Sequence, residues 1–214
     1  MSDGQSDARR AAGHPAPMSA PPPPGGSRAR RGRAVFLDRD GVLVRAEVHE
    51  GKSYAPRRLQ DFRLLPGAVE AVRTLHEHGF LTIVVTNQPD IGNGLVEADV
   101  IAAMHEILRQ RMPLDAIQMC PHRQSDDCNC RKPKAGLLTD AAERFSLDFS
   151  SCFMVGDRCS DVVAGRAVGC YTLFVDRGYD RCRDLRPDAV VGSVRQAVRH
   201  ILSRSGPSEQ HPPK

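Results

Sequence analysis

The chain has 214 residues, of which 26% are charged and 40% are hydrophobic, and this length and composition suit one ordinary domain. No run approaches the roughly 18 consecutive apolar residues of a membrane span, so the sequence excludes a transmembrane protein. Residues 1–33 carry the whole net charge of +4, since the remaining residues hold 24 basic and 24 acidic side chains. The rest of the chain therefore lacks the basic excess typical of nucleic-acid binding.

Composition divides the chain into three regions. Residues 1–33 are rich in Pro, Gly, Ala, Ser and Arg and show no periodic apolar face. We therefore expect a disordered extension there, with a basic tether or a transit-like segment as the alternative. Residues 34–204 are expected to form one folded domain, and residues 205–214 (SGPSEQHPPK) form a second, shorter tail.

Along the domain, short apolar runs alternate with stretches whose apolar residues recur at helical spacing. In chain order, the sequence predicts a strand at 34–37, a helix at 66–78, a strand at 81–85, a helix at 96–111, a strand at 116–119, a helix at 136–145, a strand at 152–155, a helix at 161–168, strands at 171–175 and 189–191, and a helix at 194–202. This alternation predicts an α/β fold in which an open parallel sheet has helices on both faces. Ligands of such folds bind beyond the carboxyl ends of the strands.

The first predicted strand is followed directly by the motif DRDG at 38–41. Asp38 and Asp40 lie two residues apart at the strand end, so both carboxylates can approach one small site. Like charges this close are costly unless a cation neutralises them. Gly41 permits a sharp turn away from the strand. An ordinary acidic turn is the alternative interpretation.

Two more predicted strands end in polar residues. Thr86 begins the motif TNQ directly after 81–85, and a hydroxyl group there can donate to a bound anion. The motif GDRCSD at 156–161 follows the strand at 152–155. We interpret Asp157 as functional, whereas Asp161 either caps the next helix or supports the site.

A cationic cluster, RKPK at 131–134, precedes another predicted helix. A solvated run of charge is its usual explanation. Together with the carboxylates and the threonine at strand ends, a lysine of this cluster nevertheless suits a divalent cation and a phosphoryl group.

Residues 120–130 (CPHRQSDDCNC) combine cysteine and histidine at short spacing. Cys120, His122, Cys128 and Cys130 are zinc ligands of the commonest types, and four protein ligands would fill a tetrahedral site. We therefore predict a structural zinc, with unrelated buried cysteines as the alternative. The odd total of seven cysteines and the lack of a secretory apolar segment argue against a disulfide framework and for a reducing compartment. The other cysteines are expected to be core or surface thiols.

Four motifs occur together and in order, namely FLDRDGV, VVTNQ, CPH…CNCRKPK and MVGDRCSD. As a set they resemble the haloacid dehalogenase superfamily of phosphohydrolases, over about residues 33–179. The branch they are similar to holds the D-glycero-D-manno-heptose 1,7-bisphosphate 7-phosphatases and the histidinol-phosphate phosphatases. The resemblance implies a Rossmann-like core without a large cap domain and with a zinc-bound loop beside the site.

The resemblance also implies roles for individual residues. Asp38 would be the nucleophile that forms an aspartyl-phosphate, and Asp40 the general acid and base. The implied cofactors are Mg²⁺, held by Asp38, Asp157 and the backbone carbonyl of Asp40, and Zn²⁺ on the four residues named above. The implied phosphate and substrate contacts are Thr86, Asn87, Gln88, Arg131, Lys132 and Arg158.

The implied activity is Mg²⁺-dependent removal of the 7-phosphate from D-glycero-D-manno-heptose 1,7-bisphosphate. Histidinol phosphate or another small sugar phosphate is the alternative substrate, and a non-catalytic binding domain is the alternative of a different class. We expect a monomeric, cytoplasmic enzyme whose partner is a small phosphorylated metabolite, with neither nucleic acid nor membrane involved.

One loop departs from the family pattern. After TNQ, the heptose phosphatases have a small residue, Gly-Ile and then an arginine two residues further on. In this chain Asn93 stands where that arginine would help to bind a second phosphate, and Asp90 adds an acid. Both changes make the charge of the loop more negative, so we expect the loop to bind anions less well.

Overall fold

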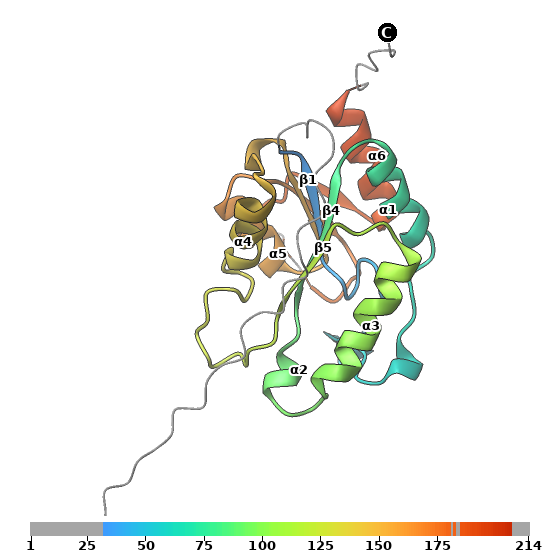
Figure 1. The fold of residues 1–214 in the computed structure, drawn as a ribbon, viewed down its shortest axis with the longest axis vertical. Coiled ribbons are helices and arrows are strands. Elements are labelled where there is room, and N and C mark those ends of the chain that lie inside the picture. Colours follow the sequence, from blue (N-terminus) through green and yellow to red (C-terminus); the bar gives the residue numbers. More distant parts are fainter. Residues whose placement is uncertain (1–31, 181, 183–184, 207–214) are drawn as a thin grey trace, which may run out of the picture.

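The computed structural model describes residues 32–180, 182 and 185–206. Six parallel strands form its central sheet in the spatial order β5-β4-β1-β6-β7-β8. Figure 1 labels β1, β4 and β5 of this sheet. The strands are β1 (Ala34–Leu37), β4 (Leu81–Asn87), β5 (Ala116–Cys120), β6 (Phe153–Gly156), β7 (Tyr171–Val175) and β8 (Ala189–Val191). The predicted open parallel sheet is therefore confirmed. Most of the two predicted tails lies outside the described residues.

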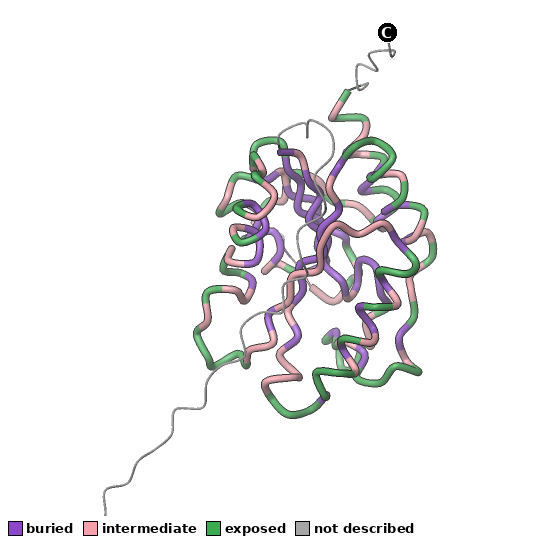
Figure 2. The backbone as a smooth tube through the Cα atoms, in the orientation of Figure 1, coloured by how far each residue is buried: buried purple, intermediate pink, exposed green. Residues whose placement is uncertain are grey.

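Helices cover both faces of the sheet (Figure 1). They are α1 (Ala68–Glu77), α3 (Ala98–Arg111) and α6 (Val194–Ser205) on one face, and α4 (Gly136–Phe145) and α5 (Cys159–Ala167) on the other. Each face has its own apolar core between sheet and helices. Figure 2 shows buried residues along the sheet and exposed ones on the outer sides of the helices, as expected for a doubly covered sheet.

The central strand shows why these residues form a buried strand. All four residues of β1, from Ala34 to Leu37, are apolar and fully buried. A continuous apolar run suits a parallel strand that is covered on both faces. In α1, by contrast, Ala68, Ala71, Val72 and Leu75 recur at helical spacing and only that stripe is buried.

Several short elements were not predicted. They are the antiparallel hairpin of β2 (Glu47–His49) and β3 (Lys52–Tyr54), the one-turn helix α2 (Pro89–Gly92), and the 3₁₀ turns η1 (Leu59–Asp61) and η2 (Phe149–Ser151). None of them is longer than four residues, so none has room for a full period of apolar residues. Among the described residues, no helix is both long and apolar enough to pass through a lipid bilayer.

The order of strands fixes where a ligand would bind. The chain adds β4 and then β5 on one side of β1, and then returns to the other side of β1 with β6. Loops leaving β1 and β6 therefore diverge at their carboxyl ends, which opens a crevice at this edge of the sheet. The motifs at 38–41, 86–88 and 156–161 all lie at this crevice, because β4, β1 and β6 are neighbours.

Candidate active site

Three carboxylates meet at the carboxyl end of the central strands. Asp38 directly follows β1, Asp157 directly follows β6, and Asp161 lies in the first turn of α5. All three residues are buried, and one carboxylate oxygen from each lies within 4.8 Å of the others. The sequence predicted that Asp38 and Asp157 would come together, and the structure adds Asp161 to them.

Lys132 neutralises part of this cluster. Its Nζ lies 2.7 Å from Oδ1 of Asp38 and 2.6 Å from Oδ1 of Asp161, and it donates to the carbonyl of Val85. Burial alone would lower the pKa of Lys132, but the Asp161 and Asp38 carboxylates outweigh burial and raise it. The lysine therefore stays charged, and it connects two of the three acids.

Asp161 both caps the helix α5 and supports the site, the two alternatives that the sequence left open. Its Oδ2 accepts the backbone N–H of Arg158 at 3.0 Å, which caps the start of α5, while Oδ1 pairs with Lys132. Burial raises the pKa of Asp161 to about 6, against the opposing effect of Lys132. Asp161 is thus a cap and a support of Lys132 at once.

One carboxylate oxygen of Asp157 accepts a hydrogen bond, whereas the other has no hydrogen-bond partner among the described residues. Oδ2 accepts the hydroxyl of Tyr179, whereas Oδ1 is buried without a hydrogen-bond partner in the described structure. Burial raises the pKa of Asp157 well above its usual range, and the charges of Asp38 and Asp161 raise it further. A divalent cation among these hard oxygen ligands would relieve that repulsion, so the donor set fits Mg²⁺.

Gly41 is required by the crowding at this point. It adopts a φ of +90°, and a Cβ atom there would overlap the Asp157 carboxylate and the Tyr179 hydroxyl. The glycine thus allows the chain to turn directly beside the acids, as predicted. Tyr179 itself was missed, because a lone tyrosine in a loop carries no pattern.

A second network fixes the side chain of Asp40. Arg39, which is fully buried, donates from Nε to both oxygens (3.1 Å to Oδ1 and 3.0 Å to Oδ2), and its Nη2 forms an ion pair with Oδ2 at 2.9 Å. Gln88 donates to Oδ2 at 2.8 Å. Burial raises the pKa of Asp40 even though Arg39 opposes this effect. A raised pKa retains the proton that a general acid must give.

Arg39 is held in turn by a residue of α3. Its Nη1 lies 3.2 Å from Nε2 of His105, which is 6% exposed. Burial, together with Arg39 and Arg109, lowers the pKa of His105 to about 3. The neutral ring therefore accepts a hydrogen bond from the Arg39 guanidinium group. Sequence analysis missed both residues, since a single histidine on an apolar helix face is usually part of the core.

Asn87 braces the segment that carries Lys132. Its amide Nδ2 donates to the Lys132 carbonyl at 3.0 Å, and its Oδ1 accepts the Lys132 N–H at 3.1 Å. The sequence predicted Asn87 as a substrate contact, and it does line the cleft. Its two backbone bonds show that it also positions Lys132.

A cleft of about 640 Å³ opens above these residues. It is lined by the predicted residues Asp38, Asp40, Thr86, Asn87, Gln88, Arg131, Lys132 and Arg158. Arg131 contributes a buried Nη1 that has no hydrogen-bond partner in the described structure. Arg158 donates to Oγ of Ser53 at 2.8 Å and so ties the β2–β3 hairpin to the cleft. A second cavity of about 210 Å³ is lined by residues 51–54 of the hairpin together with Arg158, Tyr179 and Asp180.

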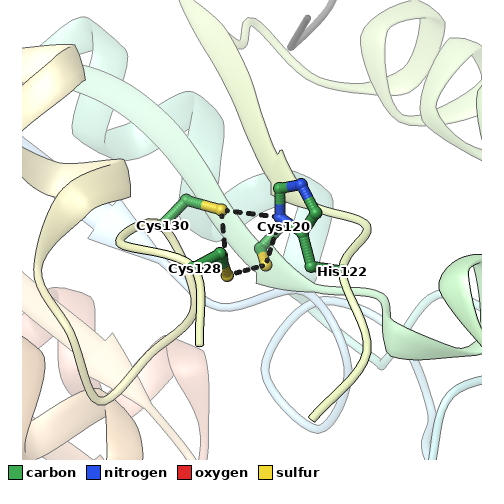
Figure 3. Close-up of side chains that lie close together, drawn as sticks. All are labelled: Cys120, His122, Cys128 and Cys130. Atoms are coloured by element: carbon green, nitrogen blue, oxygen red, sulfur yellow. Dashed lines mark hydrogen bonds between the residues drawn. The ribbon is translucent and has the colours of Figure 1, made fainter. Parts of the chain in front are cut away.

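The four predicted zinc ligands also come together, where β5 ends (Figure 3). Cys120 lies 3.6 Å from both His122 and Cys128, His122 lies 3.2 Å from Cys130, and Cys128 lies 3.5 Å from Cys130, between ligand atoms. Two sulfurs on a tetrahedral zinc, each about 2.3 Å from the metal, would be about 3.8 Å apart. The spacing of the donor atoms therefore fits zinc. Burial raises the pKa of the Cys130 thiol.

One cysteine expectation is wrong. The sequence treated Cys159 and Cys182 as thiols, but the structure joins them in a disulfide. The disulfide joins the start of α5 to the segment after β7. The two cysteines are 23 residues apart in the sequence, so no local pattern predicts that they pair. Cys152 and Cys170 are buried free thiols in the core, as expected.

A parallel sheet with a buried aspartate after its first strand, a lysine and further aspartates at its crevice defines a hydrolase of the haloacid dehalogenase (HAD) class. The HAD-hydrolase-like family profile matches residues 129–197. The D-glycero-beta-D-manno-heptose-1,7-bisphosphate 7-phosphatase of Pseudomonas aeruginosa is 35% identical over 67% of this chain and 81% of its own length. The corresponding phosphatase of Thermosynechococcus vestitus is 32% identical over 81% of this chain and 97% of its own length.

A solved structure of the same family has a similar fold. The D,D-heptose 1,7-bisphosphate phosphatase from B. bronchiseptica, complexed with magnesium and phosphate, is 28% identical with a TM-score of 0.69, covering 81% of this chain and 99% of that one. The chain therefore belongs to the HAD-like hydrolases, in the family of the heptose-1,7-bisphosphate 7-phosphatases, and it is a phosphatase.

Proposed function

We propose that this phosphatase removes the 7-phosphate from D-glycero-D-manno-heptose 1,7-bisphosphate. The observation that carries the proposal is Asp38, buried at the cleft with Lys132 on one of its oxygens. The names of relatives at 30–35% identity support the choice of sugar. The proposal includes the cytoplasmic location and monomeric state expected from the sequence.

In this proposal Asp38 and Asp40 divide the chemistry. An oxygen of Asp38 bonds to phosphorus while the bond from phosphorus to the sugar oxygen breaks, and Asp40 gives its proton to that leaving oxygen. Asp40 then takes a proton from a water molecule, whose oxygen displaces Asp38 from phosphorus and releases phosphate. Covalent catalysis of this kind replaces one difficult displacement by two easier ones.

Cationic groups and donors around Asp38 would hold the phosphoryl oxygens. Lys132 and Thr86 are expected to bind the transferring group, and Arg131 brings an uncommitted buried N–H to the same cleft. Phosphoryl transfer depends mainly on alignment and on neutralisation of charge, which these residues supply. Arg158 is proposed as a further substrate contact beside the hairpin.

Two metal ions complete the proposal. Asp38, Asp157 and the backbone carbonyl of Asp40 would hold Mg²⁺, and the free Oδ1 of Asp157 supports this assignment. Mg²⁺ supplies positive charge that stabilises the phosphoryl oxygens. Zn²⁺ on the 120–130 cluster would fix the loop that directly precedes Arg131 and Lys132.

Phosphate release from a substrate panel tests the proposed function. The panel holds both anomers of heptose 1,7-bisphosphate, other sugar phosphates and histidinol phosphate, each with Mg²⁺, and Asp38→Asn serves as the control. We expect one heptose anomer to give the highest kcat/KM. A clear preference for histidinol phosphate or for another sugar would overturn the choice of substrate. No release above the Asp38→Asn control would favour a non-catalytic protein.

A further inference from the structure

We infer that Arg57, held by Asp90, binds the second anionic group of the substrate, at the end of the cleft away from the reacting phosphoryl group. The inference rests on the proposed function, because it assigns the end of the substrate that is not hydrolysed. It names the substrate class as a sugar with two anionic groups. Neither residue belongs to the motifs that carry the chemistry.

Arg57 and Asp90 come from two different segments that meet at the cleft. Arg57 lies between β3 and η1, and Asp90 lies in the short helix α2 directly after Gln88. Nε of Arg57 is 2.6 Å from Oδ2 of Asp90, and both residues line the same cleft as Asp38. The Asp90 side chain is 16% exposed, whereas that of Arg57 is 46% exposed. The acid is thus the buried support, and the guanidinium is the accessible partner.

The guanidinium group retains its capacity to bind an anion. Among the described residues, its only hydrogen-bond partner is Asp90, and that bond uses Nε alone. The two terminal nitrogens still carry four N–H donors in a planar fork, the geometry that matches a phosphate or carboxylate. A surface ion pair adds little to stability, so the Arg57–Asp90 pair is better explained as a positioned binding group than as a structural bond.

The remaining cations of the cleft are placed for the other end of the substrate. Lys132 is paired with Asp38 and Asp161, and Arg131 is its neighbour in sequence. Arg158 is bonded to Ser53, beside the same acids. Arg57 is the fourth cation that lines the cleft within the described residues. It pairs with Asp90 and not with the buried acids, so its terminal nitrogens can bind a second anion.

The Arg57–Asp90 pair changes the interpretation of the loop at 89–94, which differs from the family pattern. The sequence alone predicts that Asp90 repels anions and that Asn93 lacks the positive charge of the family's arginine. In the structure the Asp90 charge is matched by Arg57, and the Asn93 amide bonds to Gln124 at 3.2 Å. The positive charge at this end of the cleft thus comes from the segment after the hairpin.

Arg57→Gln tests the inference on matched pairs of substrates. The pairs are heptose 1,7-bisphosphate with heptose 7-phosphate, and fructose 1,6-bisphosphate with fructose 6-phosphate. We expect KM for the bisphosphate to rise about 10- to 100-fold with kcat nearly unchanged, while the monophosphate is affected less than about twofold. Arg57→Lys keeps the charge without the fork, so it should restore part of the discrimination.

Arg58→Gln is the matched control. Arg58 is the next residue, is 71% exposed and pairs with Asp61 outside the cleft, so its loss should leave both substrates unchanged. Equal effects of Arg57→Gln on the two members of a pair, or no effect, would overturn the subsite.

Failure of the proposed function has a separate signature. It would appear as a wild-type enzyme that prefers another bisphosphate pair while its preference still depends on Arg57. If the wild type releases phosphate from no member of either pair, calorimetric titration of Asp38→Asn with each member supplies the comparison. Binding of a bisphosphate no tighter than its monophosphate would then overturn the subsite.

Discussion

Arg39 connects Asp40, the proposed general acid, to the packing of the α3 helix. It is a fully buried charge that is satisfied on one side by the Asp40 carboxylate and on the other by His105. A buried charge survives in a core only when such partners are present. Asp40, the proposed general acid, is therefore held by Arg39 from inside the protein and by Gln88 from the wall of the cleft.

The buried His105 predicts a particular dependence of stability on pH. Its pKa falls from 6.5 in the unfolded chain to about 3 in the fold. A lowered pKa gives stability that is fully present above pH 6.5 and is lost as the pH falls toward 3. Between pH 7 and pH 5 the wild type should lose about 2 kcal/mol of unfolding free energy through this group alone.

His105→Gln should remove that part of the pH dependence, because glutamine offers Arg39 an acceptor that does not titrate. Urea unfolding at pH 7 and pH 5 measures the difference. The control is His49→Gln, since the His49 side chain is 69% exposed in the β2–β3 hairpin. The same loss with pH in His105→Gln as in the wild type would contradict a buried neutral imidazole.

At the scale of elements, the 120–130 loop shows how a short segment can be ordered without a large core of its own. Cys120 ends β5, while Cys128 and Cys130 immediately precede Arg131 and Lys132. Gly136, where α4 begins, packs so closely on Asn129 that a Cβ atom would collide with its carbonyl. The loop thus links the four candidate zinc ligands, Lys132 and the start of α4.

Metal analysis tests this account of the loop. The wild type should hold close to one zinc per chain, and Cys128→Ser should lose most of it, because a tetrahedral site needs all four ligands. Since the loop also places Lys132, kcat/KM should fall together with the zinc content. Cys170→Ser, at a buried cysteine outside the cluster, should retain the metal. Zinc-free wild-type protein would contradict the assignment.

The strands and longer helices could be predicted because each carries a full apolar pattern. α4 (Gly136–Phe145) and β7 (Tyr171–Val175) match the predicted bounds, whereas α5 begins two residues before the predicted helix. Its first turn holds Cys159 and Ser160, which follow the strand-end acid and show no apolar period. The hairpin at 47–54 was missed for the same reason, since its residues are mostly polar or exposed.

At the scale of the whole molecule, strand order explains why the proposed catalytic and metal-binding residues could be predicted and the residues that support them could not. Asp38, Thr86 and Asp157 occupy strand ends, and parallel strands bring their ends together whatever the loops do. Tyr179, His105 and Arg57 act from a loop, a helix face and the segment after a hairpin. Their places depend on tertiary contacts that no local spacing records.

The covalent step at Asp38 is the central claim, and trapping the phosphoryl-enzyme tests it most directly. The wild type is mixed with the panel substrate that it hydrolyses fastest, quenched in acid and mapped by peptide mass spectrometry. We predict a phosphoryl group on Asp38 and, in Asp38→Asn, neither that adduct nor measurable turnover. An adduct on another residue, or phosphate release by Asp38→Asn at a rate near that of the wild type, would contradict the account.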